Sequence, residues 1–147
     1  MTTPVPFVPV PYPHGTITAA IVPHEDRPSL PHFFGARLTQ AELLVYRWMN
    51  ALCGRYGGGY LHFYKLSNGG FYMAPACEQR MRLAVDGNGF DNELSADAAG
   101  IVACLSAFYE LAQDEDSHER FVCLYHRLRD YAAGHPEAGL IFRAIGS

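Results

Sequence analysis

The segment from Tyr60 to Asp97 constrains the fold of this chain more than any other. It contains two apolar runs, Tyr60–Leu66 and Phe71–Pro75, separated by the four residues Ser67-Asn68-Gly69-Gly70. An Asn-Gly pair readily adopts the positive φ angles of a tight turn, so the pattern predicts an antiparallel hairpin. A third apolar run, Met81–Val85, ends at a second glycine-rich turn, Asp86-Gly87-Asn88-Gly89. We therefore predict a small antiparallel sheet of about three strands.

Helical patterns surround this sheet. The capping box Thr39-x-x-Glu42 starts a first helix, and its apolar stripe follows helical spacing. Ser95 predicts the start of a second helix, whose apolar pattern continues to Ala112. Asp116-x-x-Glu119 repeats the capping pattern for a third helix, and Pro136 begins a short last one. The predicted class is α+β, with three main helices and a short C-terminal helix around the sheet.

The first 15 residues have a different composition from the rest of the chain. They contain half of the ten prolines, in near-alternation: Pro4, Pro6, Pro9, Pro11 and Pro13. Because proline fixes φ and lacks an amide donor, this pattern favours an extended polyproline-like or disordered arm. Recognition of the arm by a proline-binding partner is the alternative. Residues 16–147 are predicted to form a single domain.

Charge is distributed unevenly along the sequence. The chain has a formal charge of −4, yet the stretch from Asp86 to Glu119 holds nine carboxylates and neither Lys nor Arg. Duplex DNA carries one charge per about 1.7 Å, so nine carboxylates imitate only about 15 Å of it. This length disfavours wholesale mimicry of DNA and leaves a local acidic contact open. The alternative is that these carboxylates cap helices or lie in solvated loops.

The sequence contains no pattern that requires an enzyme, a cofactor or a metal ion. The four cysteines include no C-x-x-C pair, so we expect reduced and mostly buried thiols. Cys123 and His126 are spaced to share a helix face, but no third, orienting residue is evident. The Asp-Gly-Asn-Gly turn lacks the regular oxygen spacing of a calcium loop. We expect a binding protein without catalytic, cofactor or metal sites.

The remaining patterns bear on compartment and on nucleic acid. No apolar run is long enough to span a membrane, and the N-terminus lacks the features of a signal peptide, so we expect a cytoplasmic protein. Four C-terminal arginines are interleaved with carboxylates, which indicates a solvated helix face. We do not expect direct DNA binding, and a small DNA-binding regulator of a mobile element is the alternative function.

Three strings, in the same order, resemble the ArdB/KlcA-type antirestriction proteins: SNGGFYMAP, VDGNGF followed by ELSADAAGIVA, and LYHRLRDYAAGHPEAG. The likeness covers about Thr16 to Ile145 and excludes the proline-rich arm. It implies a plasmid-, phage- or mobile-element-borne protein that protects incoming DNA from cleavage by type I restriction enzymes. The partner it implies is such an enzyme or a complex containing it.

Neither the resemblance nor the chemistry assigns a binding site residue by residue. Polar residues and glycines are dense in two turns between strongly patterned elements, which is typical of binding loops. We therefore predict a partner-facing edge formed by the loop from Asp86 to Glu93 with the Ser67–Gly70 turn. The candidate partner-binding residues are Asn68, Gly69, Gly70, Asp86, Asn88, Asp91, Glu93 and Asp97.

Overall fold

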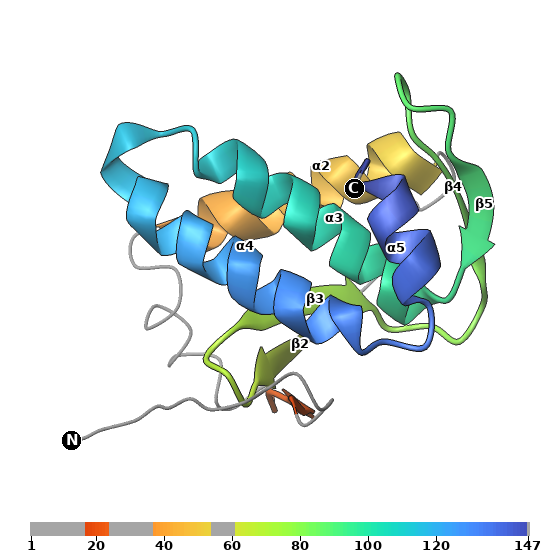
Figure 1. Ribbon diagram of the computed structural model, residues 1–147. Coiled ribbons are helices and arrows are strands. Elements are labelled where there is room, and N and C mark those ends of the chain that lie inside the picture. Colours follow the sequence, from red (N-terminus) through yellow and green to blue (C-terminus); the bar gives the residue numbers. More distant parts are fainter. Residues whose placement is uncertain (1–16, 24–36, 54–60, 147) are drawn as a thin grey trace.

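The structure is a computed structural model, and it describes residues 17–23, 37–53 and 61–146. The proline-rich arm lies outside these residues. The described chain forms two small antiparallel sheets and a layer of helices (Figure 1). In chain order the elements are β1 (Ala19–Ile21), α2 (Leu38–Cys53), β2 (Leu61–Leu66), β3 (Phe71–Pro75), β4 (Met81–Ala84), β5 (Asp91–Leu94), α3 (Ala96–Leu111), the 3-10 helix η4 (Glu115–Ser117), α4 (His118–Ala133) and α5 (Ala138–Ala144).

The first sheet confirms the predicted hairpin. β2 and β3 pair antiparallel with Phe63 opposite Met73, and the Ser67–Gly70 turn joins them. Gly69 has a φ of 89°, in the left-handed region that favours glycine. β1 pairs with β2 on the other side, so the strand order is β1-β2-β3 and β1 is an edge strand. All five residues of β3 are buried, because helices α3 and α4 pack against it.

The third predicted strand belongs to a different sheet. β4 pairs with β5 rather than with β3, so the structure has a three-stranded and a two-stranded sheet. The sequence pattern did not predict β5, because Asp91-Asn92-Glu93-Leu94 contains three polar residues and alternates only weakly. β5 exists because its backbone completes a hairpin around the second glycine-rich turn, whose Gly87 and Gly89 have φ of 92° and 74°. The α+β class itself is confirmed.

α3 is the central helix. Twelve of its sixteen residues are buried, as expected for a helix surrounded by other elements. Its backbone lies against β3: a Cβ built on Gly100 would be 2.5 Å from Ala74 Cα and from the Met73 carbonyl oxygen. Four residues further on, Cys104 lies one turn along the same face, and its Sγ is 3.2 Å from the Met73 amide nitrogen. The face of α3 that carries Gly100 and Cys104 therefore covers β3.

Two predicted helix starts differ from those observed. α2 begins at Leu38, so Thr39 lies inside the first turn rather than at the N-cap. Before α4, Asp114 caps η4 by accepting a hydrogen bond from the Asp116 amide at 3.1 Å. Asp116 therefore receives no capping role, because the 3-10 turn places the start of α4 at His118. At α3 the prediction is confirmed: the Ser95 hydroxyl accepts a hydrogen bond from the Ala98 amide.

In the parts of the chain that the structure describes, no helix is both long and apolar enough to cross a membrane.

Candidate interaction site

The β4–β5 turn is fixed in place by one side chain. The Asn88 Oδ1 atom accepts a hydrogen bond from the Phe90 amide at 2.8 Å, which closes the turn. On the other side of the amide group, Nδ2 donates to the Ala144 carbonyl oxygen at 3.0 Å, at the end of α5. Both glycines of the turn face open space, since a Cβ on Gly87 or Gly89 would meet nothing within 4 Å. Asn88 thus attaches an otherwise exposed turn to the body of the protein.

The strands beyond this turn carry exposed ion pairs. Arg82 Nε lies 2.8 Å from Asp91 Oδ1, and Arg80 Nε lies 3.7 Å from Glu93 Oε1. These side chains are between 54% and 66% exposed, so water screens each pair and the pairs stabilise the fold little. Asp86 is exposed as well. This outer face of the hairpin is therefore accessible and contributes little to stability.

The Ser67–Gly70 turn has a different environment. The Asn68 Nδ2 atom donates to the Arg127 carbonyl oxygen on α4 at 2.9 Å, and Asn68 Oδ1 accepts from the Gly70 amide. A Cβ on Gly69 would lie 2.9 Å from Arg127 Nη1, and Gly70 is buried. This turn is packed onto α4. It lies far from the β4–β5 turn, which contacts α5 (Figure 1). The structure therefore does not bring the two predicted turns together into one edge.

Asp97 takes part in a partly buried network at the first turn of α3. Its Oδ1 accepts a hydrogen bond from the Tyr72 hydroxyl at 2.7 Å, and its Oδ2 lies 2.9 Å from His135 Nε2. The His135 Nδ1 atom accepts from the Glu137 amide at 3.0 Å, so Nε2 carries the proton and donates to Asp97. Burial opposes ionisation of Asp97, but the hydrogen bonds from His135 and Tyr72 hold its pKa below the ordinary value.

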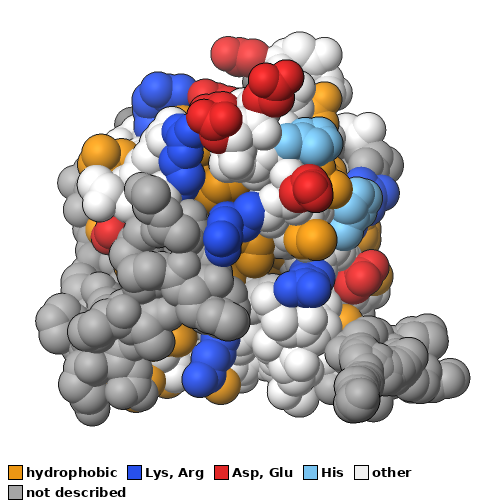
Figure 2. Space-filling model, turned by 90° about the vertical axis from the view of Figure 1, so that its left-hand side faces the viewer, with side chains coloured by type: hydrophobic (Ala, Val, Ile, Leu, Met, Phe, Trp, Pro, Cys, Tyr) orange, Lys and Arg blue, Asp and Glu red, His pale blue; other side chains and the backbone are white. Residues whose placement is uncertain are grey.

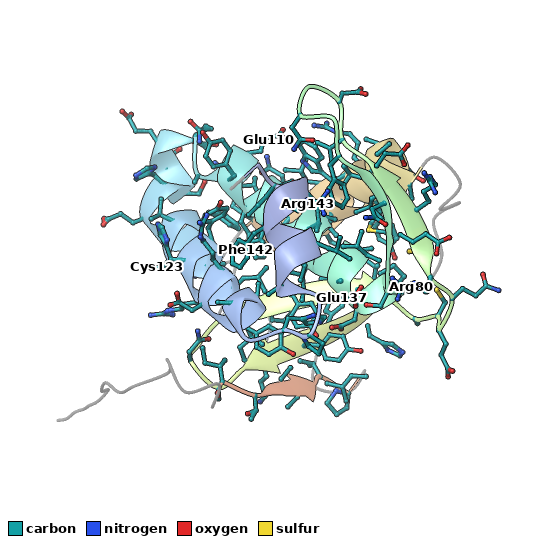
Figure 3. All side chains as sticks on the ribbon, turned by 45° about the vertical axis from the view of Figure 1, so that its right-hand side comes forward. Arg80, Glu110, Cys123, Glu137, Phe142 and Arg143 are labelled. Atoms are coloured by element: carbon teal, nitrogen blue, oxygen red, sulfur yellow. The ribbon has the colours of Figure 1, made fainter. Side chains whose placement is uncertain are left out.

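The network continues at Glu137, which lies with His135 in the connection between α4 and α5. Glu137 accepts hydrogen bonds from the Ser95 amide, at 2.9 Å, and from the Ser95 hydroxyl. Arg80 Nη2 lies 3.7 Å from Glu137 Oε1, and both side chains occupy one corner of the molecule (Figure 3). Burial opposes ionisation of Glu137, but the hydrogen bonds from Ser95 hold its pKa below the ordinary value. Asp97 is therefore a structural link between β3, α3 and the α4–α5 connection. His135 and Glu137 lie in one of the strings that carry the family resemblance, but sequence reasoning did not select them as site residues because their partners Asp97 and Ser95 are 38 and 42 residues away.

The sheet side of this network is aromatic. Tyr72 stacks between two other tyrosine rings, with centroid distances of 4.8 Å to Tyr64 and 5.7 Å to Tyr131. Burial raises the pKa of the Tyr72 hydroxyl far above its ordinary value, and the bond to Asp97 acts in the same direction. The hydroxyl therefore remains a hydrogen-bond donor under all physiological conditions.

A concave aromatic pocket of about 380 Å³ lies beside the β4–β5 turn. Elements that are distant in sequence meet there: α2, the β4–β5 turn, α3, α4 and α5. The lining residues are Trp48, Leu52, Val85, Asn88, Val102, Ser106, Tyr109, Tyr125, Ala144 and Ile145. The indole nitrogen of Trp48 donates to Glu110 Oε1 at 3.1 Å, which fixes the ring. Tyr109 is 63% exposed, an unusual fraction for so large an aromatic residue.

The acidic stretch does not form one surface. Asp86, Asp91 and Glu93 lie on the β4–β5 hairpin, whereas five carboxylates lie at the opposite end of α3: Glu110, Asp114, Glu115, Asp116 and Glu119. The sixteen residues of α3 span about 24 Å. The α3–α4 end also carries Arg side chains among its acidic ones (Figure 2). Two of the five carboxylates are paired there, Glu110 with Arg47 and Asp114 with Arg37.

The cysteines are less buried than predicted. Cys104 is fully buried, and burial raises its pKa to about 12. Cys77 and Cys123 are exposed and Cys53 is intermediate, because helix periodicity and loop position place these side chains away from the core. Cys123 lies on the outer side of α4 (Figure 3). Within the described ranges no group of three His, Cys, Asp or Glu residues is arranged to hold a metal ion.

Comparison with known proteins places this architecture in a class. The profile of a family described as antirestriction protein matches residues 54–146. Two Escherichia coli relatives named antirestriction protein KlcA are 52% identical over 134 residues and 50% identical over 137 residues. Each match covers 88% of this chain, and 94% or 93% of the relative. An uncharacterised protein of E. coli K12, YafX, is 40% identical over 95% of this chain and 94% of its own length.

A solved structure shares the fold. It superposes with a TM-score of 0.82 at 52% identity, over 88% of this chain and 95% of that one. It is described as showing that KlcA and ArdB have a novel fold and antirestriction activity against type I DNA restriction systems in vivo but not in vitro. This chain therefore belongs to the antirestriction protein family, as its resemblance in sequence implied.

Proposed function

We propose that this protein inhibits DNA cleavage by type I restriction enzymes, and so protects incoming mobile DNA in the cytoplasm. The observation that carries the proposal is its likeness to KlcA over nearly the whole length of both chains, with the same fold. At 52% identity over 88% of this chain, a shared activity is the simplest expectation.

The protein acts by binding rather than by catalysis. Its clustered titratable groups are Asp97, His135 and Glu137. Asp97 is hydrogen-bonded to Tyr72 and His135. The Glu137 amide donates to His135, and the Glu137 carboxylate accepts from Ser95. Each of these contacts holds secondary-structure elements together, which is a structural use. The exposed Cys123 also lies on the side of α4 away from this network. These observations support a binding mode without a reacting centre.

Wholesale mimicry of DNA is not the mode of inhibition. The carboxylates of the Asp86–Glu119 stretch are divided between two ends of α3, and Asp97 is occupied by Tyr72 and His135. A DNA mimic needs a continuous row of charges spaced like phosphates. The outer face of the β4–β5 hairpin, with Asp86, Asp91 and Glu93, remains the proposed contact for the partner.

The partner is a type I restriction enzyme or a complex that contains it. Activity of the KlcA and ArdB proteins in vivo but not in vitro favours a complex with a cellular component that purified assays lack. Three of the four C-terminal arginines make contacts within the protein, which disfavours direct DNA binding. Arg129 lies over the Phe142 ring at 5.1 Å, Arg143 over the Phe90 ring at 5.7 Å, and Arg127 contacts the Gly69 carbonyl.

Plating efficiency of unmodified phage on cells with a type I restriction system tests the proposal. Cells that express the protein should show raised plating efficiency, while DNA methylation by the same system continues. A matched strain with the restriction subunit deleted gives the upper limit. Unchanged plating with folded, expressed protein would refute the proposal, and loss of methylation would point to occupation of the enzyme's DNA-binding groove instead.

A further inference from the structure

The aromatic pocket is suited to a particular kind of ligand. Three aromatic rings from three helices line it: Trp48 of α2, Tyr109 of α3 and Tyr125 of α4. The Tyr109 and Tyr125 ring centroids are 6.2 Å apart and their planes are tilted by 56°, so the rings form a ridged wall rather than a closed stack. Tyr125 Oη accepts a hydrogen bond from Arg129, at 3.4 Å, which leaves its own proton available for donation.

Such a surface fits a polyproline II segment. Proline-rich segments lack amide donors, leave their carbonyl oxygens unpaired and are pre-ordered before binding. Grooves that recognise them are lined by aromatic side chains, which pack on the proline rings and donate hydrogen bonds to the carbonyls. The pocket supplies both properties.

A second depression lies further along α2, and its lining includes Leu43, Leu44, Arg47, Glu110 and Asp114. Glu110 accepts the hydrogen bond from the Trp48 indole, which lines the aromatic pocket. Residues Thr39 to Leu52, which contribute to the two depressions, span about 20 Å of helix. A polyproline II segment of six or seven residues has about the same length.

The chain contains one segment of this kind, and it carries no charge. Residues 4–13 read PVPFVPVPYP, with five prolines, Phe7 and Tyr12. An uncharged, proline-rich ligand matches a pocket whose lining residues are apolar or uncharged polar. We propose that residues 4–13 of a second copy of this chain occupy the aromatic pocket, so that two copies exchange arms. The proposal does not rest on the antirestriction function.

Chain reach favours a second copy as the source of the arm. β1 is two strands from β3, about 10 Å, and α3 adds a helix diameter of about 10 Å on the far side of β3. At 100° per residue, Val102, Ser106 and Tyr109 lie opposite the Gly100 face that covers β3, so the pocket is beyond α3. Pro13 is four residues from Ile17, which is packed against the core, and four residues span about 14 Å at most.

Chain reach therefore disfavours binding of the whole segment along its own pocket. Reciprocal exchange between two copies satisfies both arms and closes as a symmetric dimer. This arrangement would also explain why a residue as large and apolar as Tyr109 stays exposed in the single chain.

The single tryptophan makes the first test direct, because Trp48 lies in the pocket. A synthetic peptide of residues 4–13, which has no tryptophan, is titrated against the chain lacking residues 2–13 while only tryptophan is excited. A saturable change in emission is expected. Tyr109→Ala should weaken the apparent affinity about tenfold, as truncation of a central aromatic contact does. Tyr109 is mostly exposed, so this variant keeps the fold, and circular dichroism checks it.

Two controls sharpen the titration. A peptide with Pro9→Ala and Pro11→Ala keeps the length and apolar character but loses the polyproline preference, and it should bind more weakly. Leu43→Ala removes an exposed side chain of the second depression and should have a smaller effect than Tyr109→Ala. No change in emission at any soluble peptide concentration would refute occupation of the pocket.

The second test concerns the full chain. Sedimentation velocity should show a concentration-dependent dimer, which is lost both on deletion of residues 2–13 and in Tyr109→Ala. A dimer that persists without these residues would refute arm exchange, and so would a full chain that stays monomeric at every accessible concentration.

Discussion

The two hairpins of this protein begin from the same local signal and end in opposite environments. Both have a glycine-rich turn that contains an asparagine, and in both the asparagine Oδ1 accepts from the amide two residues later. The β2–β3 turn is packed against Arg127 of α4, and β3 is buried along its whole length. The β4–β5 turn is exposed, and its glycines meet nothing within 4 Å. The comparison separates residues that fold the protein from residues that are available to a partner.

The largest expected effect comes from the buried side of this comparison. In Gly100→Ala the added methyl group would overlap the backbone of Met73 and Ala74 at 2.5 Å, and neither strand nor helix can move away without loss of packing. We expect a loss of more than about 3 kcal/mol in the free energy of unfolding, or failure to fold. Denaturant unfolding measures it.

The matched control is Gly139→Ala on the exposed side of α5, where an added Cβ has open space. It should leave stability unchanged or raise it by up to about 1 kcal/mol through helix propensity. Equal stability of the two variants would contradict the close α3–β3 contact.

Removing the charge at the start of α3 should have the next largest effect. Asp97→Asn replaces one of the two acceptor oxygens with a donor, so either Tyr72 or His135 loses its partner. We expect a loss of about 1–3 kcal/mol, the usual cost of an unsatisfied buried polar group. Thermal unfolding measures the loss. Tyr72→Phe removes one donor and places no second donor opposite His135, so it should lower stability less than Asp97→Asn does. A larger loss in Tyr72→Phe than in Asp97→Asn would contradict the assigned hydrogen bonds.

Acidification should reproduce this effect gradually. The pKa values of Asp97 and Glu137 are lowered in the folded state, so the unfolded state binds more protons when the pH falls. Their contribution is complete above the ordinary pKa values of about 4, and it decreases as the pH falls through and below them. Unfolding free energies measured from pH 7 to pH 3 should decline, and the decline should be shallower in the Asp97→Asn, Glu137→Gln variant. Identical slopes would show that other groups cause the decline.

The smallest effect on stability is expected on the outer face of the β4–β5 hairpin. Asp91 and Glu93 are exposed and their ion pairs are screened, so Asp91→Ala with Glu93→Ala should change stability by less than about 1 kcal/mol. Under the proposed function the same variant should restore restriction of unmodified phage. A control at the other end of α3, Glu115→Ala with Asp116→Ala, removes the same charge. Full protection by the folded hairpin variant would exclude this face as the partner contact.

Local patterns were sufficient for most of the elements. The Ser67–Gly70 turn and the helix capped by Ser95 both follow from short-range rules, because turn conformation and capping involve residues only a few positions apart. The pairing of β4 was not predictable in this way. Its partner β5 is polar and short, and only the closed hairpin shows that it is a strand.

The candidate site depended much more on tertiary structure. Asp97 was selected from a polar segment, but its partner His135 is 38 residues away, and no spacing rule connects them. The aromatic pocket joins Trp48 to Tyr109 and Tyr125 across three helices. On the sequence these residues were part of apolar stripes, and the packing angle of the helices decides that they face a shared depression.

The sequence alone determined the family, the α+β class, the main helices and the turn chemistry, because these depend on residue types at short, regular spacings. The tertiary structure decided which polar residues are accessible. It divided the acidic stretch between the two ends of α3 and turned Asp97 into a packing contact. It also placed the Asn68 turn against α4 and left the β4–β5 turn exposed. Accessibility is set by what each surface packs against, and that is a property of contacts between segments far apart in the chain.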